Sequence, residues 1–445
     1  MRSLILLLGL LLCTSCSWAL EVKEGQFWFR GQPVTLLGDS FQGALGNSAL
    51  DYEAWLDDVQ KEGLNCIAFW GLWPVRQWSD GRNSDSDRWG TDYPVEALMP
   101  WARIGKSPGF DGLPQYDFGK WDERYWQRIR DLCEAASERG LIVQISLFDE
   151  CLLEPAVRGG ARGWWWHPFC YRNGGPINND HDGFEAYDLA SSRVQLVERR
   201  YVRRMLLETA EFDNVCFELC NEGSTASDEW NLYWLSYVKA HSRAPIAMNA
   251  DFGQAPPEFW LAAPECDYVT FHPSFDLAQN VELWRRYAGK GKPVVIDEAN
   301  PEYQGLAGGT GPGGFLPVFW AAALCGGHYM LQDDSPCGYG SATTRYTEGH
   351  QDRKLLAPLG QLCQKGLYRP APEAVAKPAF GAWLGKQLVV FLPEGCAQAS
   401  LEASLDPKRI RWLEVLTGQW MPEQAQTSPA KPAGLSGPAV AVISF

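Results

Sequence analysis

Basic residues are scarce in this 445-residue sequence, which has 39 Lys and Arg against 54 Asp and Glu and a formal net charge of -15. No basic stripe or Lys/Arg cluster offsets this charge locally, so the chain would repel phosphate backbones and anionic membrane surfaces. The sequence therefore predicts no nucleic-acid partner. With 46% hydrophobic and 21% charged residues, it is typical of a globular protein long enough for one large domain and a smaller one.

The sequence also lacks an apolar run at its N-terminus that is long enough to span a bilayer. The run there, Leu4 to Leu12, is too short. It follows Arg2 and precedes small and polar residues up to Ala19, which is the layout of a secretory signal peptide. We expect cleavage after Ala19 and a secreted or periplasmic protein. The alternative is lipid attachment at Cys16, which would make the protein an outer-membrane lipoprotein.

Paired metal-ligand motifs are missing as well. Removal of the signal peptide takes away two of the thirteen cysteines and leaves an odd number, which is not typical of a disulfide framework. Cys216 and Cys220 have the spacing of half a zinc site, but no second Cys/His pair stands at zinc spacing. Both lie in an apolar run, where cysteine usually acts as a small hydrophobic residue. The sequence predicts neither a metal nor an organic cofactor.

Short apolar runs recur through the first three quarters of the chain and alternate with helical periodicity. The runs are residues 34–39, 64–70, 141–149, 214–220, 245–249, 268–272, 293–298 and 328–332. The helical segments are residues 52–62, 123–139, 191–211, 229–241, 257–262, 277–287, 315–324 and 353–365. Eight apolar strands that alternate with helices favour an α/β fold, a (β/α)8 TIM barrel, over an open sheet. No G-x-G-x-x-G motif follows the first run, which disfavours a dinucleotide-binding fold.

Two further β regions flank the predicted barrel. Residues 27–34, "FWFRGQPV", are expected to form a hairpin that turns at Arg30-Gly31 and closes the bottom of the barrel. From Tyr368 a Pro-rich link leads into short β-rich runs separated by turns. The predicted organisation is a signal peptide over residues 1–19, a barrel over residues 20–368 and a small C-terminal antiparallel β-sandwich domain over residues 369–445.

The stretch "FELCNEG", residues 217–223, places carboxylates within an apolar strand and at its exit. Alternation along the strand puts Glu218, Cys220 and Glu222 on the side that faces the barrel interior. The stretch "KPVVIDEAN" ends the seventh strand in the same way, at Glu298. Catalytic groups of such barrels stand at the C-terminal ends of strands, so Glu222 and Glu298 are expected to face each other across the barrel mouth, as glycoside hydrolysis requires. Glu218 should lie deeper and orient its neighbours.

These stretches resemble a known family. "FELCNEG" and "VVIDEAN" resemble the Asn-Glu and Glu signatures of the retaining glycoside hydrolases of clan A, the TIM-barrel superfamily that contains cellulases, mannanases and β-galactosidases. "GLNCIAFWGLW" resembles the second-strand region of that clan, and "HPFCYRNGGPIN" an active-site loop of its cellulase-like bacterial members. With its C-terminal β region, the chain is similar to secreted apiosidase-like members. The resemblance implies that Glu222 is the acid/base, Glu298 the nucleophile and Asn221 the partner of the sugar 2-hydroxyl.

The sequence departs from the clan's pattern near the site. Phe69 stands where many members carry an Arg beside the nucleophile, Gly223 stands where Pro is common, and the eighth strand has no clear Trp platform. Glu298 is therefore expected to be supported by a different set of residues. The substrate-binding candidates besides Asn221 are Asp39, Trp70, Asp149, Trp166, Asn173, His272 and Asp333.

Other interpretations of these residues stay open. Glu222 and Glu298 would also fit a structural ion pair at the barrel mouth, and Asn221 a plain turn residue. His272 would fit a satisfied core histidine, and the aspartates would fit helix caps or salt-bridge partners.

Tryptophan is abundant, with 21 residues, and rings presented to solvent stack well on the apolar faces of sugars. The triplet at residues 164–166 cannot face one way throughout, so packing beneath a loop is as good an interpretation as a sugar platform. Residues 76–121 form a long insertion after the second strand, which we expect to build one wall of the cleft.

The sequence thus predicts a secreted retaining glycosidase that degrades a poly- or oligosaccharide, with a β-linkage implied by the resemblance alone. Two rivals are a non-catalytic carbohydrate-binding protein on the same fold and an inverting glycosidase that uses an Asp as its base.

Overall fold

The computed structural model describes residues 19–48, 50–73, 98–110, 112–154, 164–250, 258–272, 277–287, 291–299, 316–332, 354–366, 368–435 and 437–445. Apart from Ala19, the predicted signal peptide lies outside the described residues, as do Cys16 and Asp333. Glu298 is described as part of a strand, but its side chain is not.

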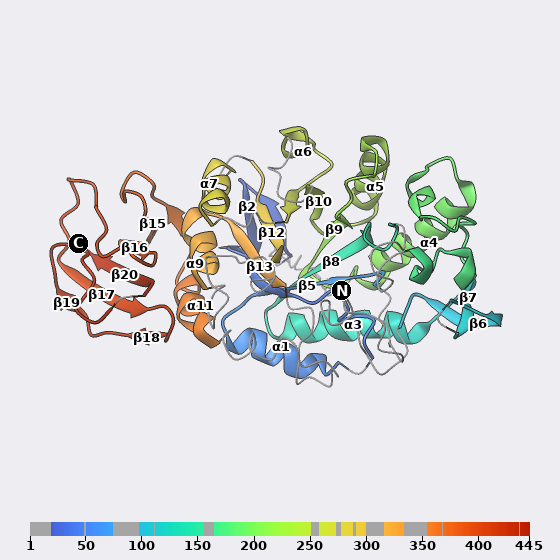
Figure 1. Cartoon of the computed structure of the whole chain (residues 1–445), viewed down its shortest axis with the longest axis horizontal. Helices are drawn as coiled ribbons and strands as arrows, with labels where there is room; N and C mark the ends of the chain where they lie inside the picture. The colour runs from blue at the N-terminus through green and yellow to red at the C-terminus, as the bar shows by residue number, and fades with distance from the viewer. Residues whose placement is uncertain are drawn as a thin grey trace, which may run out of the picture.

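Eight parallel strands close into a barrel, in which each strand pairs with the next one in chain order and the last pairs with the first (Figure 1). They are β4 (Leu37–Ser40), β5 (Cys66–Trp70), β8 (Ile142–Asp149), β9 (Val215–Asn221), β10 (Ile246–Ala250), β11 (Tyr268–Phe271), β12 (Val294–Ala299) and β13 (His328–Gln332). Each one coincides with a predicted apolar run to within three residues at either end. The predicted (β/α)8 TIM barrel is therefore confirmed.

Helices follow the strands on the outside of the barrel. They are α1 (Tyr52–Lys61), α3 (Glu123–Glu138), α4 (Ser192–Glu208), α5 (Asp228–His241), α6 (Glu258–Ala262), α7 (Leu277–Tyr287), α9 (Leu316–Cys325) and α11 (Ala357–Cys363), with the 3-10 turn η5 (Lys354–Leu356) before α11. Side-chain caps begin several of them. Asp51 accepts a hydrogen bond from Ala54 N, and Ser227 accepts one from Trp230 N, which satisfies backbone donors that the first helical turn leaves unpaired.

A hairpin closes the bottom of the barrel, as predicted. The strands β1 (Glu21–Lys23), β2 (Gln26–Phe29) and β3 (Gln32–Val34) form a small antiparallel sheet. The turn between β2 and β3 holds Arg30 at φ 50° and Gly31 at φ 75°, two left-handed residues of the kind that tight hairpins require. Phe27 packs edge-on against Tyr268 and His328, each with ring centroids 5.0 Å away. Because these two residues begin β11 and β13, Phe27 seals the N-terminal ends of the strands.

The predicted insertion after the second strand contains a hairpin. β6 (Trp101–Pro108) and β7 (Pro114–Trp121) pair antiparallel and lie at one end of the molecule in Figure 1, beyond α4. Residues 76–97 and residue 111 of the insertion lie outside the described residues.

The C-terminal region forms a seven-stranded antiparallel sheet at the opposite end of the molecule (Figure 1). Its strands are β14 (Arg369–Pro370), β15 (Phe380–Leu384), β16 (Gln387–Leu392), β17 (Arg409–Glu414), β18 (Gln419–Trp420), β19 (Gln424–Ala425) and β20 (Ala439–Ser444). We expected a sandwich here, but the strands pair into one sheet. One face carries its own apolar cluster with Trp412 and Ile443, which residues of the connecting loops complete.

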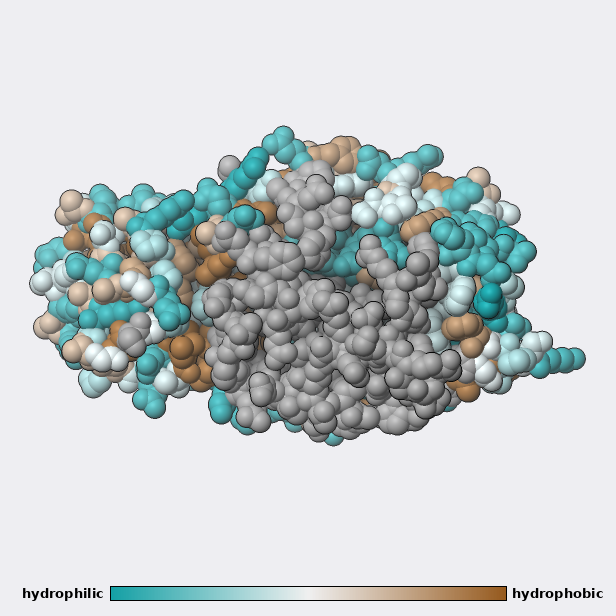
Figure 2. Space-filling view, in the orientation of Figure 1, coloured by the Kyte–Doolittle hydropathy of each residue, from teal (hydrophilic) through white to brown (hydrophobic). Residues whose placement is uncertain are grey.

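The other face of this sheet packs on the barrel. Val389 and Phe391 of β16 belong to the same apolar cluster as the barrel core, together with nine buried residues of α9. A helix that is apolar on all sides must be covered on all sides, and the sheet covers the side of α9 that faces away from the barrel. Figure 2 shows hydrophobic residues gathered at this junction. Within the described residues, no helix is long and apolar enough to cross a membrane.

Candidate active site

Five of the predicted site residues stand where barrel strands end. Trp70, Asp149 and Asn221 are the last residues of β5, β8 and β9, Glu222 follows β9, and His272 follows β11. Counted around the barrel, β9 is the fourth strand and β12, which contains Glu298, is the seventh. These C-terminal ends of the strands form the face of the barrel opposite Phe27.

Four side chains from three strand ends form a continuous chain of polar contacts. Asn221 donates from Nδ2 to Asp149 Oδ2 at 3.0 Å, and its Oδ1 lies 3.2 Å from His272 Nε2. On the other side of the imidazole ring, His272 Nδ1 lies 3.2 Å from Glu222 Oε1. Asp149, Asn221 and His272 are buried, whereas the Glu222 side chain is 34% exposed. The chain of contacts thus ends at a carboxyl group that solvent and small molecules can reach.

Hydrogen-bonding capacity determines where protons lie in this chain. A carboxylate only accepts, so Asn221 must direct its amide group at Asp149 and its carbonyl oxygen at His272. His272 Nε2 then carries a proton, which leaves Nδ1 facing Glu222. A proton held by either the ring or the carboxyl group would bridge Nδ1 and Oε1 at this distance. His272 is therefore placed to exchange a proton with Glu222, as a general acid/base requires of its neighbour.

The backbone of Glu222 is in an unusual conformation. Its φ is 52°, a left-handed value that is rare in residues other than glycine. Its carbonyl oxygen accepts a hydrogen bond of 2.7 Å from Ser224 N, so a tight turn follows the strand directly. Left-handed residues other than glycine cost free energy and gather at functional sites.

The loop after β8 reaches the same turn. The Glu150 carboxylate accepts hydrogen bonds from Thr225 N and Thr225 Oγ1 at 2.9 and 2.7 Å, and from Tyr187 OH at 3.1 Å. Glu150 N in turn donates to Asn221 O at 3.0 Å. These bonds tie the ends of β8 and β9 together. The next residue, Cys151, donates a hydrogen bond from its thiol to Glu222 Oε2.

A buried polar layer lies one level deeper in the barrel, at Glu218. This carboxylate is 0% exposed and accepts hydrogen bonds from Ser146 Oγ, Thr270 Oγ1 and, at 2.8 Å, Asn249 Nδ2. The four residues come from β8, β9, β10 and β11, so Glu218 ties adjacent strands directly below the chain that ends at Glu222. This contact set matches the expectation that Glu218 orients its neighbours.

Strand alternation does not hold to the end of β9. The sequence predicted Cys220 on the interior side together with Glu218. Instead, Cys220 Sγ lies 3.5 Å from Tyr187 OH of the 3-10 turn η3 (Phe184–Tyr187), outside the barrel, and the next residue, Asn221, bonds to Asp149 and His272. A similar shift occurs in β8, where Phe148 packs on Trp230 of α5 and Asp149 joins the site.

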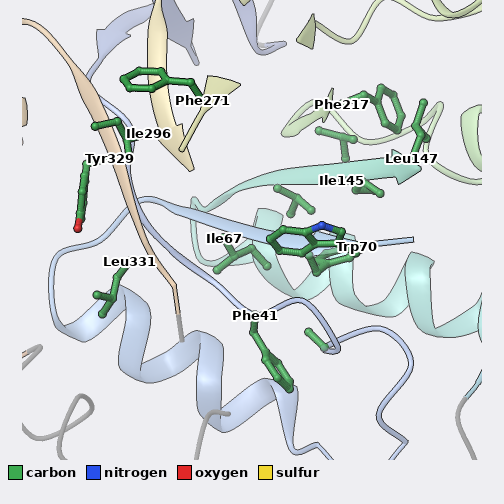
Figure 3. Packing of buried hydrophobic residues seen from close by; sticks show 14 of the residues in the cluster. Phe41, Ile67, Trp70, Ile145, Leu147, Phe217, Phe271, Ile296, Tyr329 and Leu331 are labelled. Carbon is green, nitrogen blue, oxygen red and sulfur yellow. The ribbon is translucent and has the colours of Figure 1, made fainter. Parts of the chain in front are cut away.

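Two predicted binding residues lie away from this group. Asp39 is 0% exposed and accepts a hydrogen bond of 2.8 Å from Trp55 Nε1 of α1, so it faces the helix layer. Trp70 is 2% exposed and packs in the core cluster with Ile67 and Ile145 (Figure 3). Because β4 and β5 direct these side chains into packed layers, the structure does not bring them to Glu222.

The loop between β8 and α4 holds the remaining candidates. Asn173 is buried and donates to Trp165 O and His167 O while accepting from Phe110 N at 2.9 Å, so its side chain organises the loop. Trp166 is half-buried and contacts Phe110 edge-on at 4.9 Å. Trp164 is fully buried. The triplet therefore points in different directions, and one of its three rings packs beneath the loop.

Sequence reasoning missed Glu150 and Cys151, although both follow a strand in the stretch "LFDEC". The rule that functional groups stand just after strands would have singled them out. In the described part of the chain, no group of three or more His, Cys, Asp and Glu side chains is arranged to hold a metal ion, and Cys216 and Cys220 are buried free thiols.

Comparisons with known proteins bear mainly on the fold. A family model described as a domain of unknown function, DUF6298, matches residues 51–246, less than half of the chain, and no curated protein matches the sequence. A solved structure described as a glycoside hydrolase aligns with a TM-score of 0.61 and 15% identity, over 96% of this chain and 97% of that one. A glycoside hydrolase family 5 protein from Bacteroides vulgatus ATCC 8482 aligns with a TM-score of 0.64 and 12% identity, over 96% and 93%. At these identities the likeness establishes a shared fold.

Proposed function

We propose that this protein is a secreted glycoside hydrolase that cleaves a poly- or oligosaccharide with retention of anomeric configuration. Glu222 is the acid/base and Glu298 the nucleophile in this proposal. The observation that carries it is the chain from Asp149 through Asn221 and His272 to the half-buried Glu222, at the C-terminal end of the fourth strand of a TIM barrel. The two solved structures named above are glycoside hydrolases on the same fold, which supports the proposal by analogy.

The first step needs a proton on Glu222. In the proposed mechanism, Glu222 protonates the glycosidic oxygen while Glu298 attacks the anomeric carbon, so that the bond to the leaving sugar breaks and a glycosyl-enzyme forms. In this proposal His272 Nδ1, 3.2 Å from Glu222 Oε1, exchanges a proton with this carboxyl group. Asn221 orients His272 and is itself held by Asp149.

The second step reverses the role of Glu222. As a carboxylate it takes a proton from water, which attacks the anomeric carbon and releases Glu298. The exposed part of the Glu222 side chain admits that water. A β-linked substrate and substrate binding by Trp166 belong to the same proposal.

The experiment is a comparison of Glu222→Gln and Glu298→Gln with the wild-type protein on aryl glycosides. We expect Glu298→Gln to lower kcat by a factor of at least about 10³, because no covalent intermediate can form. Glu222→Gln should lose most activity on substrates with poor leaving groups and retain more on dinitrophenyl glycosides, which need no acid. Glu185→Gln is the control, because that side chain bonds to Ser191 and Arg193.

Proton NMR of the first product identifies the stereochemistry. Retention supports the proposed pair of residues, whereas an inverted first product would replace it with an inverting mechanism. Wild-type protein that binds oligosaccharides but turns over no glycoside would indicate a carbohydrate-binding protein instead.

A further inference from the structure

Both oxygens of the Glu222 carboxyl group have a protein neighbour. His272 Nδ1 lies 3.2 Å from Oε1, and the Cys151 thiol donates to Oε2. Cys151 is half-buried and stands two residues after β8, on the segment that Glu150 ties to the turn following Glu222. The thiol is thus held beside the carboxyl group by the backbone on both sides of the contact.

We propose that Cys151 is a positioning residue for Glu222. Its thiol holds one oxygen of the carboxyl group, restricts rotation of that group, and biases it toward the charged form, because a donor to a carboxylate favours ionisation. As far as catalysis is concerned, this inference rests on the proposed function. The contact itself does not, so it can be tested separately.

The thiol of Cys151 is suited to this position because it is a weak donor. A thiol is a weak hydrogen-bond donor, whereas a hydroxyl or an amide N–H in the same place would stabilise the carboxylate more strongly. A residue that must be protonated in one step and ionised in the next cannot be held firmly in either form. Cys151 therefore suits a carboxyl group that changes state twice in each turnover.

Among the described residues, the other charged and titratable groups found near Glu222 belong to neighbouring elements. His272 contacts it after β11, and Asp149 acts on it through Asn221. The Glu150 carboxylate is turned toward Thr225 and Tyr187. Removal of the Cys151 thiol leaves each of these contacts in place, so its effect on Glu222 is separable from theirs.

The first test needs no catalytic activity. A thiolate next to a carboxylate is disfavoured by repulsion between like charges, so Glu222→Gln should speed alkylation of Cys151 by iodoacetamide at pH 8.5. We expect the alkylation rate of Cys151 to rise about threefold or more. If ionisation of the thiol shifts by one pH unit, the thiolate concentration, and with it the rate, changes by about tenfold. Glu185→Gln is the control and should leave the alkylation rate of Cys151 at the wild-type value, because Glu185 bonds to Ser191 and Arg193. Mass spectrometry of the labelled Cys151 peptide gives the rate in each variant.

The second test uses the pH dependence of kcat/KM on an aryl glycoside. In Cys151→Ala the Glu222 carboxylate loses a donor, so this residue should stay protonated to a higher pH. The alkaline limb of the kcat/KM profile should therefore shift to higher pH by about 0.5 to 1 unit. Cys151→Ser keeps a donor and should restore the limb to the wild-type position or below it. A residue that only filled space would lower activity or melting temperature in Cys151→Ala without moving the limb.

The outcomes distinguish this inference from the proposed function. Equal alkylation rates of Cys151 in wild type and Glu222→Gln would overturn the inference, and so would superimposable pH profiles of wild type and Cys151→Ala. If no glycoside is turned over, the proposed function fails, and the alkylation rates still decide whether the thiol and the carboxyl group are coupled.

Discussion

Glu218 offers the sharpest test of how the barrel supports the site. Its buried carboxylate accepts hydrogen bonds from Ser146, Asn249 and Thr270. Glu218→Ala would leave three donors without an acceptor and open a cavity. Each buried unsatisfied donor costs about 1 to 3 kcal/mol, so the expected loss in the free energy of unfolding is about 3 to 9 kcal/mol before the cavity is counted. Domains of this kind have only about 5 to 15 kcal/mol in total, so the variant should be unfolded or nearly so at 37 °C.

Glu218→Gln is the matched control. The amide oxygen can still accept from Asn249 and Thr270, and the hydroxyl of Ser146 can turn to accept from the new N–H group. We expect this variant to lose about 1 to 2 kcal/mol, mainly because a neutral acceptor replaces a charged one. Urea unfolding followed by tryptophan fluorescence measures both variants. A loss below about 1 kcal/mol in Glu218→Ala would refute the reasoning, because it would mean that the three donors need no acceptor.

Three further predictions concern the scaffold. Deletion of residues 369–445 should give an insoluble or dye-binding barrel, since it uncovers α9, and a soluble product with the wild-type melting temperature would contradict this. Burial lowers the pKa of His167 and of His328 to about 3, below the usual 6.5 of the unfolded chain. Between these values the unfolded chain binds protons that the native protein does not, so stability should fall as pH drops below 6.5, by up to about 1.4 kcal/mol per pH unit for each histidine. Melting temperatures from pH 7.5 to 4.5 measure this, and His328→Asn, whose amide oxygen can replace Nδ1 as acceptor, should flatten the slope. Gly360→Ala should lower the free energy of unfolding by about 1 to 3 kcal/mol, because the new Cβ would stand 2.5 Å from the Cα of Gly63. This loss should exceed the gain from the better helix propensity of alanine. A raised melting temperature would argue against that close approach.

Much of the fold could be predicted because its signals are local. A strand buried on both faces must be apolar throughout, and a helix on the outside must be amphipathic, so eight alternating segments were enough to predict the barrel. The turn at Arg30 and Gly31 was equally readable, since few residue pairs adopt two left-handed conformations in succession. The C-terminal strands were predicted too, but whether they form one sheet or two depends on pairing between residues far apart in the chain.

The candidate site could be predicted only in part. The positions of Glu222 and Glu298 follow from the rule that functional groups stand where barrel strands end. The direction of a side chain at a strand end is less certain, because alternation breaks down where the ladder ends. For this reason Asn221 reaches the site and Cys220 does not. Two other candidates are held elsewhere by tertiary contacts: Asp39 accepts a hydrogen bond from Trp55, and Asn173 accepts one from Phe110 N.

By itself, the sequence determined the barrel, the strands whose ends carry glutamates, and the excess of acidic over basic residues. Those properties depend on composition and on the spacing of neighbouring residues. Only the tertiary structure decided that Asp149, Asn221, His272 and Glu222 form one chain, and that the thiol of Cys151 donates to Glu222. These contacts join three strand ends up to 123 positions apart in the sequence, and closure of the barrel is what brings them within hydrogen-bonding distance.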